Sequence, residues 1–281
     1  MSDIAKIRPS PIAGTWYPDN PQRLSAAVDA YLAAARLPEL NGEVLAVIAP
    51  HAGHRYSGKT AGHAFRAVQG RNFDLVALVS PMHRYHHGVF LTTAHQAYAT
   101  PLGEVPVDRE AVSQLNAALA ESGAGLTPVA YDEEHALEIE LPFLQRALAA
   151  PFRLLPVMLR TQDTAAAETL GHALAKVLAG RSALLVASTD LSHFYSQVVA
   201  NQLDRAMLAR IESFAPESVL AAEHSGMGYA CGAAGVGAVL WAARDLGGDT
   251  VVVLDYSTSA DETGDPTSVV GYGAAAVLKR A

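Results

Sequence analysis

Three histidines of this chain stand where chemistry at the edge of a β-sheet would need them. His51, His83 and His193 each follow, within a few residues, a short apolar run of strand length. Imidazole nitrogens bind Fe, Cu, Zn and Ni, and histidine gains or loses its proton near neutral pH. Because the carboxyl ends of parallel strands meet at one edge of a sheet, we expect the three side chains to share a pocket there. For any one of them, a surface or hydrogen-bonded structural role is the alternative.

Asp190 precedes His193 by three residues and can face the same side in a tight turn or a first helical turn. A carboxylate in that position can bind a metal, or it can orient the imidazole and raise its basicity. The structural alternative is that Asp190 caps a helix.

Cys231 is the single cysteine of the chain, which excludes an internal disulfide and a zinc site built from several cysteines. It stands directly before Gly232, at the predicted start of a helix, where the helix dipole lowers the pKa of a thiol. A thiolate there could be a third ligand beside two histidines. An inert buried cysteine is an equally good interpretation.

An acidic stretch surrounds His135 at the start of a helix predicted over residues 135–149. His135 and Glu138 are three residues apart, so on a helix they share a face and could support the pocket from behind its ligands. The other acids of the stretch are explained by the favourable interaction of carboxylates with a helix N-terminus.

A competing signal occupies the loop after His51. Gly53, Gly58, Lys59 and Thr60 match the phosphate-loop pattern G-x-x-x-x-G-K-[ST] between a predicted strand and a predicted helix. Asp255, after a later apolar run, could then organise magnesium. Two observations argue against a nucleotide hydrolase. The loop contains three bulky side chains, and the phosphate-loop interpretation leaves the other histidines and the cysteine without a role.

The elements that must position these residues alternate along the chain. Strands are predicted at 44–49, 75–80, 153–159, 183–188, 251–255 and 270–278. Helices are predicted at 21–36, 60–68, 109–122, 135–149 and 164–178, with two or three more between 200 and 246. This alternation predicts an α/β fold: one three-layer domain over residues 1–281, with a mixed, largely parallel central sheet and helices on both faces.

Two further expectations concern the surroundings of the pocket. The separation of His51 and His83 matches one βαβ repeat and predicts that they follow neighbouring parallel strands. The turn-rich segment 88–107 predicts an antiparallel excursion that forms a wall of the crevice.

Composition restricts the class of protein. Half of the 281 residues are apolar, 17% are charged, and the formal net charge is −8 without any Lys/Arg block, which argues against a general nucleic-acid surface. The apolar runs are too short to cross a membrane, and the first residues contain no signal-peptide core. We therefore expect a cytoplasmic protein without nucleic-acid or membrane partners. The sequence contains no G-x-S-x-G motif and therefore gives little support for catalysis by a serine nucleophile.

Several of these stretches together resemble the Memo family, also called AmmeMemoRadiSam system protein B, which is similar in fold to the class III extradiol (LigB-type) dioxygenases. The matching motifs run in order over most of the chain. They are Ala13-Gly14-Thr15-Trp16-Tyr17-Pro18, Pro50-His51-Ala52-Gly53 with Tyr56-Ser57-Gly58, Pro81-x-His83, Thr100-Pro101-Leu102-Gly103, Glu134-His135-x-x-Glu138 with Leu141-Pro142-Phe143, Ser188-Thr189-Asp190-x-x-His193, and Cys231-Gly232.

The resemblance implies that His51, His83 and Cys231 are metal ligands, with Asp190 and His193 beside them. In the related dioxygenases two histidines and a glutamate hold Fe(II), and a further histidine, which His193 resembles in placement, transfers protons. Here a cysteine replaces the carboxylate, and a thiolate favours softer metals. We therefore expect Fe(II) first and copper as the alternative metal.

The implied activity is a metal-dependent oxidoreductase that acts on dioxygen and a small, aromatic molecule. His193 would move protons and Asp190 would orient it. The alternative is a non-catalytic protein that uses the same pocket for a metal or a peptide segment. The resemblance assigns Gly53–Thr60 to the family's histidine-bearing loop, so no nucleotide is expected. The oligomeric state stays open.

Overall fold

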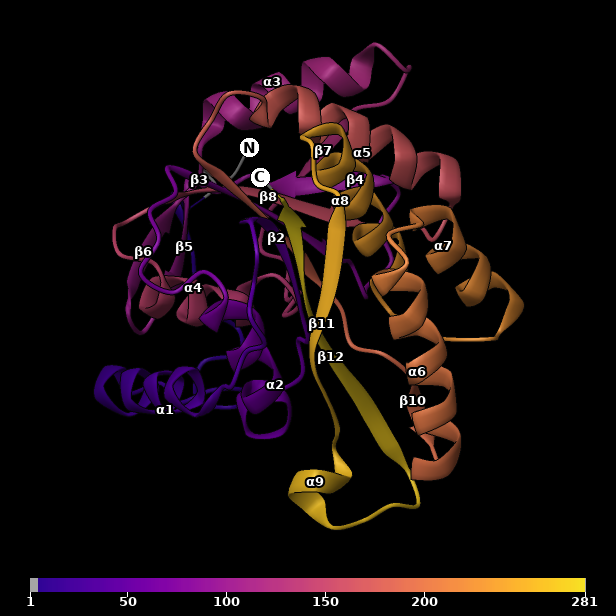
Figure 1. Cartoon of the computed structure of the whole chain (residues 1–281). Helices are drawn as coiled ribbons and strands as arrows, with labels where there is room; N and C mark the ends of the chain where they lie inside the picture. The colour runs from indigo at the N-terminus through magenta and orange to yellow at the C-terminus, as the bar shows by residue number, and fades with distance from the viewer. Residues whose placement is uncertain (1–4, 281) are drawn as a thin grey trace.

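The structure, a computed structural model, describes residues 5–280 and folds them into an α/β protein (Figure 1). The strands are β1 (Ile7–Arg8), β2 (Glu43–Ala49), β3 (Leu75–Pro81), β4 (Phe90–Thr93), β5 (Ala97–Thr100), β6 (Gly103–Pro106), β7 (Leu126–Val129), β8 (Arg153–Leu159), β9 (Ala183–Ser188), β10 (His193–Tyr195), β11 (Thr250–Thr258) and β12 (Val269–Lys279). The helices are α1 (Pro21–Ala34), α2 (His54–Arg66), α3 (Arg109–Ala120), the 3₁₀ turn η1 (Glu138–Glu140), α4 (Leu141–Ala147), α5 (Thr164–Leu178), α6 (Gln197–Glu212), α7 (Pro216–Ser225), α8 (Ala233–Asp245) and α9 (Ala260–Thr263).

The central strands form where the sequence has continuous apolar runs. Every residue of β3 is buried, and all of β8 is buried except Arg153. Strands that are buried throughout must be covered on both faces, which is the usual situation in α/β proteins. The predicted strands of the core are thereby confirmed.

The main sheet has a parallel centre and antiparallel flanks. Among the described residues it contains nine strands in the order β10-β12-β2-β9-β3-β8-β4-β7, with β11 along the other edge of β12. The four central strands β2, β9, β3 and β8 are mutually parallel, whereas β12 is antiparallel to β2 and β4 is antiparallel to β8. The predicted mixed sheet is confirmed.

The prediction that His51 and His83 follow neighbouring strands is wrong, because β9 lies between β2 and β3. The spacing of the two histidines in the sequence indicates only that a crossover connects two parallel strands. Such a crossover can leave room in the sheet for a strand that comes later in the chain. Ala49 at the end of β2 pairs with Ser188 at the end of β9. The segment after Ser188 therefore emerges between the two histidines.

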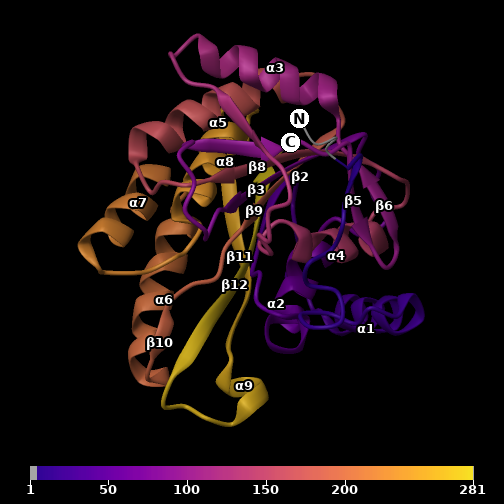
Figure 2. The ribbon, with the colours of Figure 1, turned by 180° about the vertical axis from the view of Figure 1, so that it is seen from behind.

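Helices cover both faces of the sheet, as predicted. In Figures 1 and 2, α1, α2 and α4 lie on one side, and α3, α5 and α8 lie on the other, with α6 and α7 continuing that layer. The layer is tightly packed: a Cβ at Gly171 of α5 would lie 2.5 Å from the Cβ of Trp241 in α8. A glycine is needed for this close approach.

Crossing a bilayer needs a helix of about 20 apolar residues. Within residues 5–280, no helix has the required length and apolarity. The apolar residues of the helices instead pack against the sheet.

Two predicted helices differ from the structure. Helix α2 begins at His54, ahead of the predicted start at residue 60, because its first turns bury polar and small side chains that give no apolar period. The single helix predicted over 135–149 is wrong: a turn is followed by η1 and then by α4. Pro142 in the first turn of α4 explains the break, since proline fits the start of a helix but not its interior.

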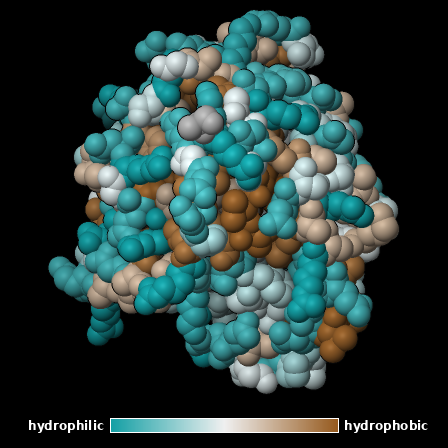
Figure 3. Space-filling model, in the orientation of Figure 1, coloured by the Kyte–Doolittle hydropathy of each residue, from teal (hydrophilic) through white to brown (hydrophobic). Residues whose placement is uncertain are grey.

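Strands β11 and β12 form a long hairpin whose tip carries α9 and projects from the body of the molecule (Figures 1 and 2). β12 continues past the parallel centre and pairs with β10, where Val270 lies opposite His193. Figure 3 shows apolar surface over β11, in which Val252 and Val253 are partly buried. The hairpin thus brings residues 259–270 close to the end of β2.

Candidate metal centre

The three ligands implied by the resemblance lie together at the carboxyl edge of the parallel strands. Nε2 of His51 lies 3.1 Å from Sγ of Cys231. The rings of His51 and His83 are 5.3 Å apart and nearly perpendicular, at 86°. One nitrogen of each histidine and the sulfur all lie within 4.8 Å of one another. Two imidazoles and a thiol at this separation can bind a single metal ion.

His51 is held in one orientation by β9 and the turn after it. Its side chain is buried, and Nδ1 lies 2.9 Å from Oγ of Ser188. Its main-chain N–H donates to Oδ1 of Asp190 over 2.8 Å. The free nitrogen, Nε2, is therefore directed toward Cys231.

His83 is held by Glu134, which the sequence reasoning did not select. Nδ1 of His83 lies 2.9 Å from Oε1 of Glu134, and the main-chain N–H of His83 donates to Oε2 over 2.6 Å. Burial raises the pKa of Glu134, but hydrogen bonds from His83 and Ala136 outweigh it and lower the pKa to about 2. The signal was present in the motif Glu134-His135-x-x-Glu138, whose first acid is the one that touches a ligand.

Cys231 lies two residues before α8 begins, in a turn that several polar groups fix. Asp190 donates its main-chain N–H to Sγ over 3.3 Å and accepts the N–H of Cys231 over 3.1 Å. Gln162, which the sequence reasoning also missed, donates to the carbonyl of Cys231 over 2.6 Å and accepts the N–H of Ala234 over 2.8 Å.

The predicted lowering of the Cys231 pKa by the helix dipole is wrong for the protein without a metal. Burial, followed by the nearby carboxylate of Asp190, raises the pKa of the thiol well above its ordinary range. Helix α8 begins only at Ala233, so Cys231 lies outside the helix. The dipole acts most strongly within the first helical turn and does not offset the burial of the thiol.

The structure also corrects the role predicted for Asp190. Its Oδ1 accepts main-chain N–H groups of His51 and Ala52, whereas Nδ1 of His193 lies 2.9 Å from the carbonyl of Leu191. Asp190 therefore positions the His51 loop and does not orient His193 through a hydrogen bond. No helix starts at Asp190, so helix capping is excluded as well.

His135 and Glu138 do not share a face. The His135 ring stacks on His83, with centroids 4.8 Å apart and planes at 13°, and it contacts Trp16 at 4.1 Å. Glu138 points away from the ligands, and it accepts hydrogen bonds from Arg8, Ser10 and Tyr17. The turn before η1 separates the two side chains.

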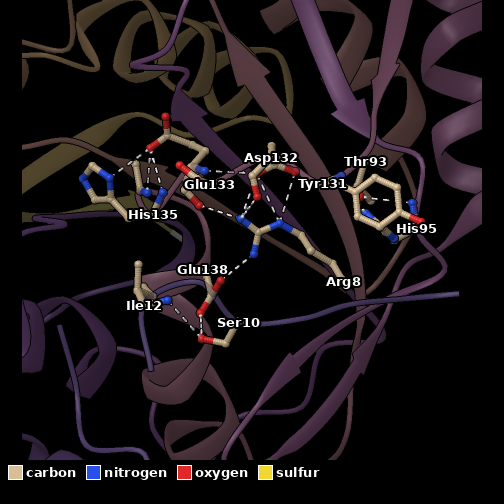
Figure 4. A network of polar contacts seen from close by, with 12 residues as sticks. Arg8, Ser10, Ile12, Thr93, His95, Tyr131, Asp132, Glu133, His135 and Glu138 are labelled. Atoms are coloured by element: carbon tan, nitrogen blue, oxygen red, sulfur yellow. Dashed lines mark hydrogen bonds and ion pairs between the residues drawn. The ribbon is translucent and has the colours of Figure 1, made fainter. Parts of the chain in front are cut away.

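Arg8 ties the N-terminal strand to the loop that supplies Glu134 (Figure 4). Its guanidinium group is buried, pairs with Asp132 at 2.8 Å and also with Glu138, and donates to the carbonyl of Glu134 over 2.7 Å. The ring of Tyr98 lies 5.0 Å from the guanidinium carbon. This network holds the loop through the main chain of Glu134, while the carboxylate of Glu134 contacts His83.

A cavity of about 600 Å³ is lined by His51 and His83, whereas Cys231 contacts His51 but is not one of the lining residues. His51, His83, His135, Asp190 and His193 line its polar side. Four aromatic residues from separate parts of the chain also line it, namely Trp16, Tyr56, Phe194 and Tyr272, together with small, hydroxyl and aliphatic residues such as Ser259, Ser268 and Val270. Within residues 5–280, no lysine or arginine lines it. The lining therefore offers neither lysine nor arginine to pair with an acidic group of a bound molecule.

One wall of the cavity is formed by a residue that the sequence did not single out, and one predicted wall is absent from it. Phe194 is 75% exposed and has a φ of 66°, a left-handed conformation that is rare for an aromatic residue. Segment 88–107, predicted as a wall, contributes no lining residue. Its strands β5 and β6 instead pair with each other, antiparallel, and β5 pairs with β1 in a separate sheet.

The phosphate-loop interpretation fails on geometry. Because α2 begins at His54, Gly58 and Lys59 lie inside a helix and cannot form a loop around a phosphate. A Cβ at Gly58 would lie 2.6 Å from the ring of Tyr31, which explains the glycine by helix packing. Lys59 is exposed, and its Nζ lies 3.8 Å from Glu262.

Comparisons with known proteins agree over nearly the whole chain. The family model described as Memo-like protein matches residues 8–276. A MEMO1 family protein of Nitrosopumilus maritimus is 31% identical over 274 residues, which cover 95% of this chain and 98% of the relative. A MEMO1 family protein of Aeropyrum pernix is 34% identical over 289 residues, covering 97% and 100%.

A solved structure extends the comparison to the fold. The uncharacterized protein JW3007 from Escherichia coli K12 aligns with a TM-score of 0.50 and 14% identity, covering 82% of this chain and 99% of that one. At this identity the likeness concerns the fold alone, and it agrees with the LigB-like α/β architecture that the resemblance implied.

Proposed function

The chain belongs to the Memo family, and on this basis we propose that it is a metal-dependent oxidoreductase that acts on dioxygen and a neutral aromatic substrate. The observation that carries the proposal is the meeting of His51, His83 and Cys231, two of which, His51 and His83, line a cavity with several aromatic residues. A volume of about 600 Å³ is within the usual range for a small-molecule site.

The donor set fits Fe(II) or copper. Imidazole nitrogens suit both metals, and a thiolate selects against hard, oxygen-binding ions such as magnesium. When bound, such a metal would supply the one-electron chemistry that reactions of dioxygen require. The partly buried thiol supports a metal role, because a cation beside Sγ would offset the desolvation and the Asp190 charge that disfavour its ionised form.

The remaining residues prepare the cavity for a phenolic ring. Nδ1 of His193 donates to the carbonyl of Leu191, so its Nε2 is the nitrogen able to accept a proton from a substrate hydroxyl. Burial lowers the pKa of His193, which favours the neutral form that acts as a base. Trp16 and Tyr272 supply flat apolar surface that would orient the ring and exclude water.

The test is metal content after anaerobic purification. We expect bound iron or copper in the parent protein and loss of that metal in His51→Ala and in Cys231→Ala, while the exposed His87→Ala keeps it. Unchanged metal stoichiometry in both site variants would reject the ligand assignment. Oxygen consumption with catechols, measured against free metal, then tests the reaction.

A non-catalytic role is the second candidate, in which the same pocket holds a metal or a peptide segment. The 75% exposure of Phe194, which lines the cavity, supports it, because this apolar ring is accessible to a bound segment. A pure binder would consume no oxygen above the free-metal background, whereas the enzyme would.

A further inference from the structure

Ser188, at the end of β9, has one hydroxyl proton and three close polar neighbours. Its Oγ lies 2.6 Å from the carbonyl oxygen of Ala136, 2.8 Å from Oε1 of Glu140 and 2.9 Å from Nδ1 of His51. A hydroxyl donates once and accepts at most twice. The positions of the other protons can therefore be worked out from the donor and acceptor capacity of each neighbour.

The carbonyl of Ala136 can only accept, and at 2.6 Å it is the nearest neighbour of Oγ. Two oxygens at that distance require a proton between them, so the hydroxyl of Ser188 donates to Ala136. The contacts with Glu140 and His51 must then bring their own protons. Glu140 donates as a carboxylic acid, and His51 donates from Nδ1.

The surroundings of Glu140 agree with a neutral acid. Its side chain is 1% exposed, and Oε2 has no hydrogen-bond partner among residues 5–280. The charged neighbour that affects it is Asp190, which has the same sign, and burial is the larger cause that raises the pKa of Glu140 well above its ordinary range. An ionised carboxylate without a cation or further donors is costly in such a place.

We propose that Glu140 is a neutral carboxylic acid that donates to Ser188, and that the pair acts as a positioning device that holds His51 in its Nδ1–H form. This form leaves the lone pair of Nε2 directed at Cys231 and available to a metal. The proposal deepens the proposed function, because its value to the protein rests on the metal site. The tautomer itself is a property of the metal-free protein and can be measured without a metal.

The first experiment reads the tautomer of His51 directly. Two-bond ¹⁵N–¹H NMR spectra of the metal-free protein should show His51 protonated at Nδ1. Ser188→Ala should shift the population toward Nε2–H, because Nδ1–H loses its acceptor. The control is Thr92→Val, which removes another buried hydroxyl that donates to a carbonyl, that of Pro156, away from the site. Nε2–H in the parent protein, or an unchanged tautomer in Ser188→Ala, would overturn the proposal.

The second experiment reads the protonation of Glu140. An infrared difference spectrum between the parent and Glu140→Gln at neutral pH should contain the C=O band of a carboxylic acid, lost in the variant. Loss of carboxylate bands instead would overturn the neutral-acid assignment. Because Gln matches Glu in volume, this readout stands even if Ser188→Ala does not fold.

Metal affinity links the device to the site. Titration with Fe(II) under anaerobic conditions should show about 10- to 100-fold weaker binding in Ser188→Ala, and a near-parental value in Glu140→Gln, whose amide can still donate. Unchanged affinity in Ser188→Ala would remove the link. If the parent protein bound no metal, the proposed function would fail. The NMR experiment would still test the tautomer of His51, and the infrared experiment would still test the protonation of Glu140.

Discussion

Glu134 holds both the ring and the main chain of His83: Oε1 lies 2.9 Å from Nδ1, and Oε2 accepts the main-chain N–H over 2.6 Å. Oε1 also accepts the N–H groups of His135 and Ala136 over 2.9 Å each. One buried carboxylate thus fixes His83, two residues after the end of β3, against the loop before η1. With Nδ1 occupied, Nε2 of His83 is the nitrogen left for a metal.

Glu134→Gln should weaken metal binding by about 10- to 100-fold. Only the oxygen of an amide accepts hydrogen bonds, so glutamine cannot replace both carboxylate oxygens, one of which accepts from Nδ1 and the other from the main-chain N–H. Isothermal titration with Fe(II) or Cu(I) under anaerobic conditions measures the effect. Glu133→Gln is the matched control, since its exposed side chain pairs with Arg84 at the surface. Equal affinities of the two variants would mean that Glu134 does not support the ligand.

The sequence was sufficient to predict the strand ends but not the order of the strands. An apolar run followed by a turn is a local pattern, so the positions of His51 and His83 at one edge could be predicted. The order in which strands join a sheet depends on how the crossover helices pack, and β9 entered between β2 and β3.

The support of the site was the part that the sequence could not reveal. Gln162 and Cys231 are 69 residues apart, and Glu140 and Ser188 are 48 apart, so no spacing rule connects either pair. Glu134 was visible as an acid near a predicted helix start, where a favourable dipole interaction is an adequate explanation. Only the tertiary fold shows that it faces His83.

Gln162→Ala should loosen the turn that presents Cys231. Its amide donates to the carbonyl of Cys231 and accepts the N–H of Ala234, and removing it leaves two part-buried main-chain groups without partners. We expect a loss of about 1–3 kcal/mol in the free energy of unfolding, measured with urea, together with weaker metal binding. Gln114→Ala is the control, because Gln114 makes its hydrogen bonds on the exposed side of α3. A parental unfolding midpoint for Gln162→Ala would contradict the prediction.

Arg8→Met should be strongly destabilising although it replaces a charge with an apolar side chain of similar length. Asp132 and Glu138 are both buried against the guanidinium group, and each would lose its counter-charge. Breaking a buried ion pair from one side costs about 3–5 kcal/mol. Arg146→Met, which breaks an ion pair with Asp29 whose side chains are 41% and 47% exposed, should cost about 1 kcal/mol or less. Similar urea midpoints for the two variants would show that the Arg8 network is not needed for stability.

His54 should make the metal-free protein sensitive to acid. Its ring is buried against Tyr17 and Phe143, and burial lowers the pKa from 6.5 to about 4 despite the hydrogen bond to the carbonyl of Ile139. Because the unfolded chain takes up a proton at this residue below pH 6.5 while the folded protein does not until about pH 4, the free energy of unfolding falls over that interval.

Well above pH 6.5 His54 is neutral in both the folded and the unfolded chain and does not lower the free energy of unfolding. By pH 5 its titration has lowered the free energy of unfolding by about 2 kcal/mol. His54→Phe keeps an aromatic ring in the same place and removes the titration, so its free energy of unfolding should fall less between pH 8 and pH 5 than that of the parent. The difference at pH 8, where the histidine is neutral in both folded and unfolded states, measures packing alone and serves as the internal control. Parallel stability curves from pH 8 to pH 5 would show that His54 takes up its proton equally in the folded and unfolded chain.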